Sequence, residues 1–247
     1  MDTVQKVEQV KHLPIKFGEV ARYVIVPGDP NRVPLIAESL DNPIHQGQKR
    51  EFNAYKGTYK GIEVSVVSTG IGCPSTAIAV EELAHIGAEV FIRIGTSGSV
   101  DKSAKKGDIF IATAAVRDDG TSKQYIPIEF PAVASHNVVD NLIKASKDLS
   151  IQTKVGICQS KDSFFGETEP ERMPTAPYLN YKWSSWQKGG VGASEMEAAT
   201  LFTLSQIKNI QAGAILAIET SDKEIVQNMT KIVLESINYM EGNRNVE

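Results

Sequence analysis

The stretch VSVVSTGIGCPSTAIAVEEL, residues 64 to 83, decides the fold of this chain. It opens with VSVV, a short β-branched run of the kind that forms a buried strand. A loop of small residues, STGIGCPS, follows this run, and TAIAVEEL then has the spacing of an amphipathic helix. A strand that passes through a glycine loop into a helix is the building element of α/β folds.

The same alternation of strands and helices continues along the chain. Predicted strands occupy residues 23–26, 64–67, 90–94, 108–116 and 212–218, and predicted helices begin near Val33, Ser75, Asn137, Glu195 and Ile225. No Pro/Gly/Ser-rich linker divides the chain, so residues 1–247 are expected to form a single α/β domain with helices covering a largely buried sheet. Residues 164–181 are rich in Pro and Glu without periodicity, which predicts a long loop of the kind that is often functional.

Composition and charge exclude several classes of protein. Of the 247 residues 41% are hydrophobic and 23% charged, as in ordinary soluble proteins, and no apolar run approaches the ~20 residues that span a bilayer. The net charge of -4 leaves no basic footprint for a nucleic acid. The first residues do not form a signal peptide, and the two cysteines, Cys73 and Cys158, fit a reducing, cytoplasmic location. Four histidines without an HExxH or CxxC motif predict no metal site.

Ligands of α/β sheets bind at the carboxyl ends of strands, where this chain has PGDPNR (27–32), STGIGCPS (68–75) and GTSGS (95–99). The glycine loop at 68–75 could bind an anion or sugar, or could be a plain turn. Arg93 lies inside an apolar run, where a charge needs a partner. That partner is either an internal carboxylate or a bound phosphate, and the adjoining Gly95 and Thr96 favour phosphate.

Three further features each have a structural and a functional interpretation. In SEMEAAT (194–200), Ser194 is predicted to cap a helix whose first turn holds Glu195 and Glu197. The helix dipole explains both carboxylates better than hydrogen bonds to sugar hydroxyls do. Phe164 and Phe165 could lie in the core or form a stacking wall for a heterocycle. Arg50, taken alone, could be a surface charge.

Taken together, these motifs resemble one family, the nucleoside phosphorylases of the purine nucleoside phosphorylase/uridine phosphorylase type. The motifs that carry the resemblance follow each other in the family's order: HL (12–13), VPGDPNR, REF (50–52), the stretch at 68–83, FIRIGTSGS, SKDSFFG and SEMEAATLF. EFPAVA (129–134) and EPERMP (169–174) are most similar to bacterial uridine phosphorylases. The resemblance implies the nucleoside phosphorylase fold, a single α/β domain with a central mixed β-sheet flanked by helices.

The resemblance also implies an activity, a pentosyltransferase that splits a nucleoside with phosphate into free base and ribose 1-phosphate. It implies no cofactor beyond phosphate as co-substrate, although some uridine phosphorylases hold a monovalent cation where this chain has Glu51, Ile71 and Ser75. It further implies a homo-oligomer, a hexamer built of dimers with sites shared between subunits. Because Arg32, Arg50 and Arg93 are all present, a phosphorylase is favoured over a nucleosidase that uses water or a non-catalytic binding protein.

Site residues follow from the resemblance position by position. The implied phosphate-binding residues are Gly28, Arg32, Arg50 from the neighbouring subunit, Arg93 and Thr96. The implied ribose-binding residues are His12 from the neighbour, Met196 and Glu197. The implied base-binding residues are Phe164, Glu167, Arg172, Ser221 and Asp222. Arg93 and Asp222 are the expected catalytic residues.

Two departures from the uridine phosphorylase pattern affect the base. Glu167 stands where those enzymes have a glutamine, and an ionised glutamate accepts hydrogen bonds but cannot donate them. Ser221 and Asp222 match the Ser-Asp pair of bacterial-type purine nucleoside phosphorylases, where the Asp protonates N7 of the purine. The sequence therefore favours a purine nucleoside, with uridine as the alternative. Asp222 could also be a plain N-cap for the helix predicted from Ile225.

Overall fold

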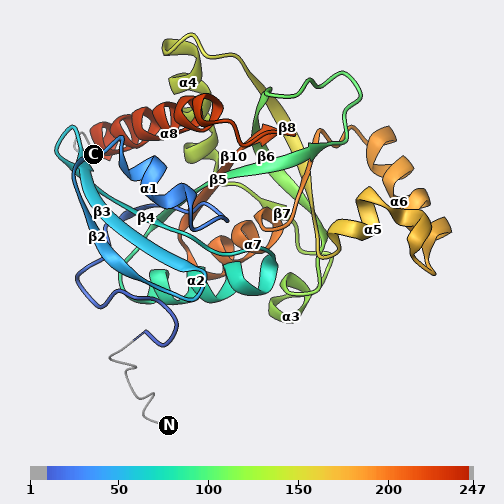
Figure 1. The fold of residues 1–247 in the computed structure, drawn as a ribbon, viewed down its shortest axis with the longest axis horizontal. Helices are drawn as coiled ribbons and strands as arrows, with labels where there is room; N and C mark the ends of the chain where they lie inside the picture. Colours follow the sequence, from blue (N-terminus) through green and yellow to red (C-terminus); the bar gives the residue numbers. More distant parts are fainter. Residues whose placement is uncertain (1–9, 245–247) are drawn as a thin grey trace.

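A computed structural model describes residues 10–244, and within them ten strands form one sheet (Figure 1). The strands are β1 (Tyr23–Ile25), β2 (Asp41–Lys49), β3 (Phe52–Tyr59), β4 (Ile62–Val67), β5 (Val90–Ser99), β6 (Ile109–Asp118), β7 (Ala132–Val133), β8 (Thr153–Lys161), β9 (Ala193–Glu195) and β10 (Gln211–Ile218). The helices are α1 (Arg32–Ala37), α2 (Cys73–His85), α3 (Ser122–Tyr125), α4 (His136–Asp148), α5 (Phe164–Thr168), the 3₁₀ turn η1 (Pro170–Arg172), α6 (Ala176–Lys188), α7 (Ala198–Lys208) and α8 (Lys223–Arg244).

The centre of the sheet is parallel, in the order β4-β1-β5-β10. Because the four strands run in one direction, the loops that follow them meet at a single edge of the sheet. Antiparallel strands extend the sheet on one side, where β4 pairs with β3 and β3 with β2. The sheet is therefore mixed, which confirms the expected fold class.

On the other side the strand pairing closes on itself. β10 pairs with β5 and with β6, β6 pairs with β8, β8 with β9, and β9 returns to β5. This circuit brings β9, which is only three residues long, into contact with both β5 and β8. These strands carry polar side chains that are buried inside the fold, among them Arg93, Lys161 and Glu195.

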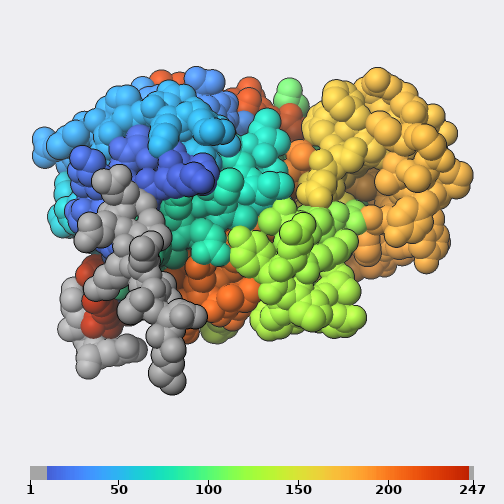
Figure 2. Space-filling view, turned by 90° about the horizontal axis from the view of Figure 1, so that it is seen from below, coloured from blue at the N-terminus to red at the C-terminus, as the bar shows by residue number. Residues whose placement is uncertain are grey.

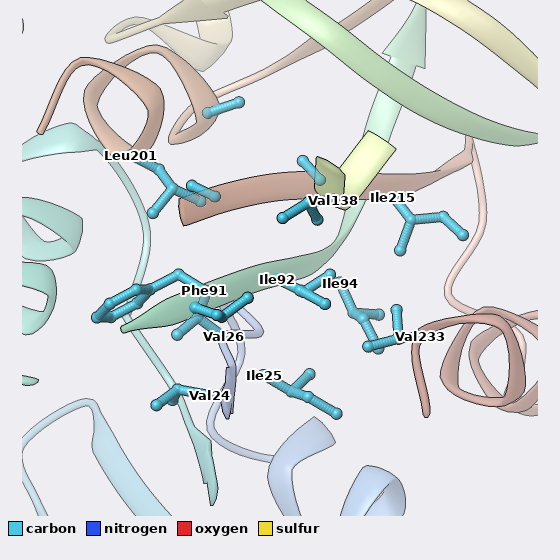
Figure 3. Packing of buried hydrophobic residues seen from close by; sticks show 14 of the residues in the cluster. Val24, Ile25, Val26, Phe91, Ile92, Ile94, Val138, Leu201, Ile215 and Val233 are labelled. Carbon is cyan, nitrogen blue, oxygen red and sulfur yellow. The ribbon is translucent and has the colours of Figure 1, made fainter. Parts of the chain in front are cut away.

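Helices bury both faces of the parallel strands, with α4 and α8 packed on one side and α2 and α7 on the other (Figure 1). Figure 3 shows the result, with Phe91, Ile92 and Ile94 of β5 among Leu201 of α7 and Val233 of α8. All five side chains are at most 1% exposed. Strands buried on both faces are apolar along almost their whole length rather than alternating, which is why their positions were predictable.

Two sequence expectations about elements were wrong, and several strands were not predicted. SEMEAAT does not begin a helix at Glu195: residues 193–195 form β9, and α7 starts at Ala198. Residues 164–181 are not a structureless loop, because they contain α5, η1 and the start of α6. The antiparallel strands β2 and β3, and also β8, were not predicted. No helix within residues 10–244 is both long and apolar enough to cross a membrane.

Candidate active site

Two glycine-containing loops meet at the carboxyl edge of the parallel strands. The Thr69 N–H, after β4, donates to the Pro27 carbonyl, after β1, over 2.8 Å. A Cβ on Gly28 would lie 3.3 Å from the Gly70 carbonyl and 3.6 Å from Nη1 of Arg93. The absence of side chains at this point lets the two loops approach each other beside an arginine, which leaves backbone rather than side chains facing that arginine.

Arg93 of β5 forms the centre of a buried ionic group, here called the Arg93 cluster, with Glu195 and Glu197. Its Nε lies 2.9 Å from Oε2 of Glu195, and its Nη2 lies 2.5 Å from Oε2 of Glu197. The Glu195 carboxylate also accepts the Glu197 and Ala198 N–H groups at the start of α7, so it neutralises that helix terminus. Both interpretations of Arg93 are thus relevant, because the internal salt bridge exists and does not use the whole guanidinium.

Two buried polar atoms of β5 have no protein partner within the described residues. They are Nη1 of Arg93 and Oγ of Ser97. Residues four apart in a strand lie on the same face, so both atoms belong to one side of β5. A buried guanidinium N–H without an acceptor costs about 1–3 kcal/mol, so this geometry calls for an acceptor from outside the protein.

Charge in the cluster is set by burial and by the ion pairs together. Burial raises the pKa of the Glu197 carboxyl, and Arg93 opposes that shift. Burial disfavours the charged form of Arg93, but the two carboxylates outweigh burial and raise its pKa. The pKa of Arg32, at the start of α1, is lowered. Burial is the largest cause, Asp29 opposes it, and the positive charge of Arg93 lowers the pKa further. The positive charge of Arg93 thus disfavours that of Arg32, an effect that a bound anion relieves.

Glu197 connects the cluster to the glycine loop. Its Oε1 accepts the Gly72 N–H over 2.5 Å, and the Cys73 thiol donates to the Met196 carbonyl over 3.2 Å. Gly72 has φ +92°, a conformation that glycine adopts without strain. The loop at 68–75 therefore has a role in the site as well as forming a turn, because its Gly72 N–H holds the Glu197 carboxylate next to Arg93. Thr96, half-buried, follows three residues after Arg93 on the same strand.

His12 and Arg50 lie outside the Arg93 cluster of their own chain. The carboxylate of Glu82, in α2, accepts the N–H groups of Lys11, His12 and Leu13 and also contacts His12 Nδ1 at 2.7 Å. Burial disfavours the ionised carboxyl, yet these bonds lower the pKa of Glu82. Arg50 is exposed, in a left-handed turn with φ +57° between β2 and β3.

The expected base-binding residues are divided between two places. Phe164 is 54% exposed and packs edge to face with Phe165, so neither lies in the core. Arg172 pairs with Glu169 at the surface over 2.6 Å. Glu167, by contrast, points inward, where its carboxylate contacts Lys161 and Ser194.

Ser221 and Asp222 are exposed at the end of β10. The Asp222 N–H donates to Thr220 Oγ1 over 3.2 Å, and its carbonyl accepts the Val226 N–H at the start of α8. The helix thus begins directly after Asp222, at Lys223, two residues earlier than expected. No contact in the described chain holds the Asp222 carboxylate toward the Arg93 cluster.

At the expected cation position, Ser75 Oγ donates to Glu51 Oε1 over 2.7 Å and Ile71 is 77% exposed. The Glu51 carboxylate accepts hydrogen bonds from the backbone N–H of Glu51 and from the Ser75 hydroxyl, and both lower its pKa. Within residues 10–244 there is no group of three or more His, Cys, Asp or Glu side chains placed to hold a metal ion.

Lys161 and Ser194 were missed as candidate site residues, and for Glu195 the helix dipole was favoured over hydrogen bonds to sugar hydroxyls. The signal for Lys161 was a lysine three residues after the apolar stretch VGIC (155–158), at the end of an unpredicted strand. Nothing local marks Ser194 or Glu195, because their partners are distant in sequence: Glu195 contacts Arg93, and Ser194 contacts Lys161.

Comparison with known proteins agrees with this geometry. A family model described as "Phosphorylase superfamily" matches residues 22–238. The uridine phosphorylase of Treponema pallidum is 42% identical, over 90% of this chain and 86% of its own length. The uridine phosphorylase of Thermococcus kodakarensis is 46% identical, over 84% and 76%. The guanosine phosphorylase of Halorubrum lacusprofundi is 38% identical, over 84% and 82%.

Proposed function

Because the chain belongs to the phosphorylase superfamily and is a nucleoside phosphorylase, hence a pentosyltransferase, we propose that its substrate is uridine. The relatives at 42% and 46% identity are both uridine phosphorylases. These relatives favour the alternative drawn from the sequence over the purine preference, which the comparisons do not support. The reaction proposed is uridine plus phosphate giving uracil and ribose 1-phosphate, in either direction.

The observation that carries the proposed phosphorolysis is the unpartnered Nη1 of Arg93, which is free to bind a phosphate oxygen. Its position beside Gly28, with Arg32 nearby, supports phosphate binding by Gly28, Arg32, Arg93 and Thr96. Guanidinium groups bind phosphate oxygens in a fixed geometry, which would orient the nucleophile toward the sugar. Two carboxylates already hold the remaining face of Arg93, so the free N–H is fixed in direction before phosphate arrives.

Glu197 is the proposed ribose carboxylate, with Met196 beside it. Sugar hydroxyls donate to a carboxylate, and this one lies 2.5 Å from Arg93, so sugar and phosphate would be held side by side. Cleavage of the glycosidic bond passes through an oxocarbenium-like state, and a phosphate held against the sugar stabilises that positive charge. Phe164, which is 54% exposed on α5, is the proposed stacking residue for the base.

We also propose that the site is completed by a second copy of the chain, in a hexamer built of dimers. Arg50 and His12 are the residues expected to cross the interface. The observation in favour is that neither reaches the Arg93 cluster of its own chain: Arg50 is exposed, and His12 is bound to Glu82. A third arginine from a neighbour would increase the positive charge facing the phosphate.

A purine nucleoside remains the second candidate substrate, on two observations. One relative, at 38% identity, is a guanosine phosphorylase. Ser221 and Asp222 also follow β10 as in purine nucleoside phosphorylases, although Asp222 is exposed and no contact directs its carboxylate into the site.

A panel of nucleosides, assayed with and without phosphate, tests the proposal. Base release from uridine is expected to require phosphate and to yield ribose 1-phosphate, and kcat/KM for uridine is expected to exceed that for inosine, guanosine and adenosine. The readout is ultraviolet detection of the free base, with the sugar phosphate measured separately. Equal turnover in phosphate-free buffer would instead identify a nucleosidase, and faster turnover of a purine nucleoside would favour the second candidate.

Asp222→Asn distinguishes the two substrates by mechanism. If uridine is the substrate, this variant should keep uridine kcat within about threefold of the wild type, because uracil has no N7 to protonate and no contact within the described residues directs the exposed Asp222 carboxylate toward the Arg93 cluster. Steady-state rates on uridine and guanosine provide the measurement. A loss of roughly 10²–10⁴-fold, the usual contribution of a general acid, would assign Asp222 to proton transfer and support the purine candidate.

A further inference from the structure

Asn53, the second residue of β3, connects the β2–β3 hairpin to the loop that carries Gly28 and Arg32. The residue is buried, with 8% of its surface exposed. Its amide Nδ2 donates to the Pro30 carbonyl over 3.1 Å, and its Oδ1 lies 3.0 Å from Nε2 of His45, in β2. An amide with a partner on its donor side and another on its acceptor side is fixed in orientation.

His45 sets the direction of this amide. A carbonyl can only accept a hydrogen bond, so the Asn53 atom that faces Pro30 is the nitrogen, and the atom that faces His45 is the oxygen. That oxygen needs a donor, which assigns the proton of the His45 ring to Nε2. The ring packs against Tyr55, its opposite residue in the strand pair, with 4.7 Å between the ring centroids. A rotated amide would place an oxygen against the Pro30 carbonyl and lose both bonds.

The Pro30 carbonyl lies where the loop enters α1. It also accepts the Val33 N–H over 3.3 Å, and proline has no N–H of its own to hold the chain. Among the residues that the structure describes, the bond from Asn53 is the only hydrogen bond that joins residues 28–31 to a part of the fold outside the loop and α1. The amide therefore restrains the loop at its entry to the helix.

We propose that Asn53 is a positioning residue for phosphate, which acts through the Pro30 carbonyl on Gly28 and Arg32. These two residues lie on either side of Pro30 in the sequence, so a shift of the carbonyl moves both. A guanidinium binds phosphate oxygens in a fixed geometry, which makes phosphate affinity sensitive to the position of the loop. The assignment rests on the proposed function, because Gly28 and Arg32 are proposed phosphate residues.

The hairpin is remote from the expected base-binding helix α5. Figure 2 shows β2 and β3, in light blue, toward the opposite end of the molecule from α5 and α6, in yellow and orange. The backbone of Asn53 exchanges hydrogen bonds with Ser68, and these bonds do not involve the amide. Replacing the side chain therefore leaves them in place and is expected to change phosphate binding without changing nucleoside binding.

Asn53→Ala tests the proposal in the full-length protein. The dissociation constant of inorganic phosphate, measured by calorimetry, and the KM for phosphate, measured at saturating uridine, are both expected to rise about tenfold. The KM for uridine and kcat are expected to stay within about threefold of the wild type. A merely structural loss would instead lower kcat, by reducing the folded fraction, and leave both phosphate constants unchanged. That second pattern would overturn the proposal.

Asn141→Ala is the matched control. Asn141, 6% exposed, is also a buried amide whose Nδ2 donates to a backbone carbonyl, that of Asn137 in α4, over 2.8 Å. Its replacement removes the same kind of bond at a position without contact to the phosphate loop, so both phosphate constants should equal those of the wild type.

His45 provides a second test, which does not require Asn53→Ala to fold. His45→Leu removes the donor to Asn53 Oδ1 and should raise the KM for phosphate about threefold, whereas His45→Gln offers an amide N–H and should restore most of the affinity. Because His45 acts through Asn53, His45→Leu should add nothing to Asn53→Ala. An unchanged KM for phosphate in His45→Leu contradicts the proposal.

Arg50, three residues before Asn53 in the hairpin, offers another route by which a change at Asn53 could reach a phosphate site, that of the neighbouring subunit. In an Arg50→Ala background, Asn53→Ala should still weaken phosphate binding about tenfold, because the Pro30 loop belongs to the same chain as Asn53. No further loss in that background would assign the effect to Arg50 and overturn the proposal.

The positioning role and the proposed substrate fail separately. If phosphate binds the wild type more tightly than Asn53→Ala but uridine is not cleaved, the positioning role stands and the proposed substrate is wrong. If uridine is cleaved but the phosphate constants of the two proteins are equal, the substrate stands and the role of Asn53 is wrong.

Discussion

Replacing Arg93 by methionine is expected to lower the free energy of unfolding by about 3–5 kcal/mol and to reduce phosphorolysis by at least about 10²–10³-fold. The stability loss arises because Glu195 and Glu197 would remain buried without a counter-charge. The activity loss arises because the only N–H of the cluster left free for phosphate disappears with the guanidinium, among the residues that the structure describes. Urea unfolding followed by circular dichroism and phosphorolysis assays measure the two effects.

A double variant separates structure from chemistry. Adding Glu197→Gln to Arg93→Met removes one of the uncompensated carboxylates, so part of the lost stability should return while activity does not. Arg22→Met is the matched control, since Arg22 pairs with Glu89 and Glu241 near the surface and such pairs contribute about 1 kcal/mol or less. An Arg93→Met enzyme with activity within tenfold of the wild type would remove Arg93 from the phosphate site.

Gly95→Ala is expected to be nearly as damaging to activity, without removing any charge. A Cβ at this position would lie 2.7 Å from Nη2 and 2.8 Å from Cζ of Arg93, and 3.0 Å from Cδ2 of Leu216. Two salt bridges hold the guanidinium, so it cannot yield without disturbing Glu195 or Glu197. A displacement of about 1 Å in a positioned group costs on the order of 10²-fold in rate, and overpacking costs about 1–3 kcal/mol of stability.

The measurement for Gly95→Ala is kcat/KM for the nucleoside together with the apparent KM for phosphate. Gly242→Ala is the control, because a Cβ there meets nothing within 4 Å and the residue lies in α8. Alanine is the better helix former, so this variant should match or slightly exceed the wild type in stability and keep full activity. Wild-type kinetics for Gly95→Ala would show that the guanidinium position is not critical.

The parallel strands were predictable because each is buried on both faces and therefore apolar along its whole length, as in VFIRI and AGAILAI. Arg93 could be identified as special for the same reason, since a charge interrupts an otherwise apolar strand. The sequence could not show that Nε and Nη2 of Arg93 are bound by carboxylates while Nη1 has no partner in the described residues. That depends on how Glu195 and Glu197 are placed by a segment about a hundred residues later, a distance over which local patterns carry no information.

The segment around Glu195 shows why a local reading failed. Glu, Met and Ala are strong helix formers, so SEMEAAT is typical of a helix start. Pairing with β5 and β8 nevertheless holds Ala193–Glu195 as a strand, and the N–H groups that open α7 bind the Glu195 side chain. Tertiary pairing thus outweighs propensity at the residues that matter most for the site. α6 was not predicted either, and none of its residues is fully buried.

The position of β10 has a consequence for how the chain reaches its native state. β5 and β6 follow each other in sequence, yet β10, residues 211–218, lies between them and pairs with both. As the chain leaves a ribosome, these two strands emerge long before the strand that joins them. Their edges must stay open during that interval, and open edges of apolar strands are prone to pair with other chains. Such distant pairing also slows folding, so the structured domain is completed late, by one of its most buried strands.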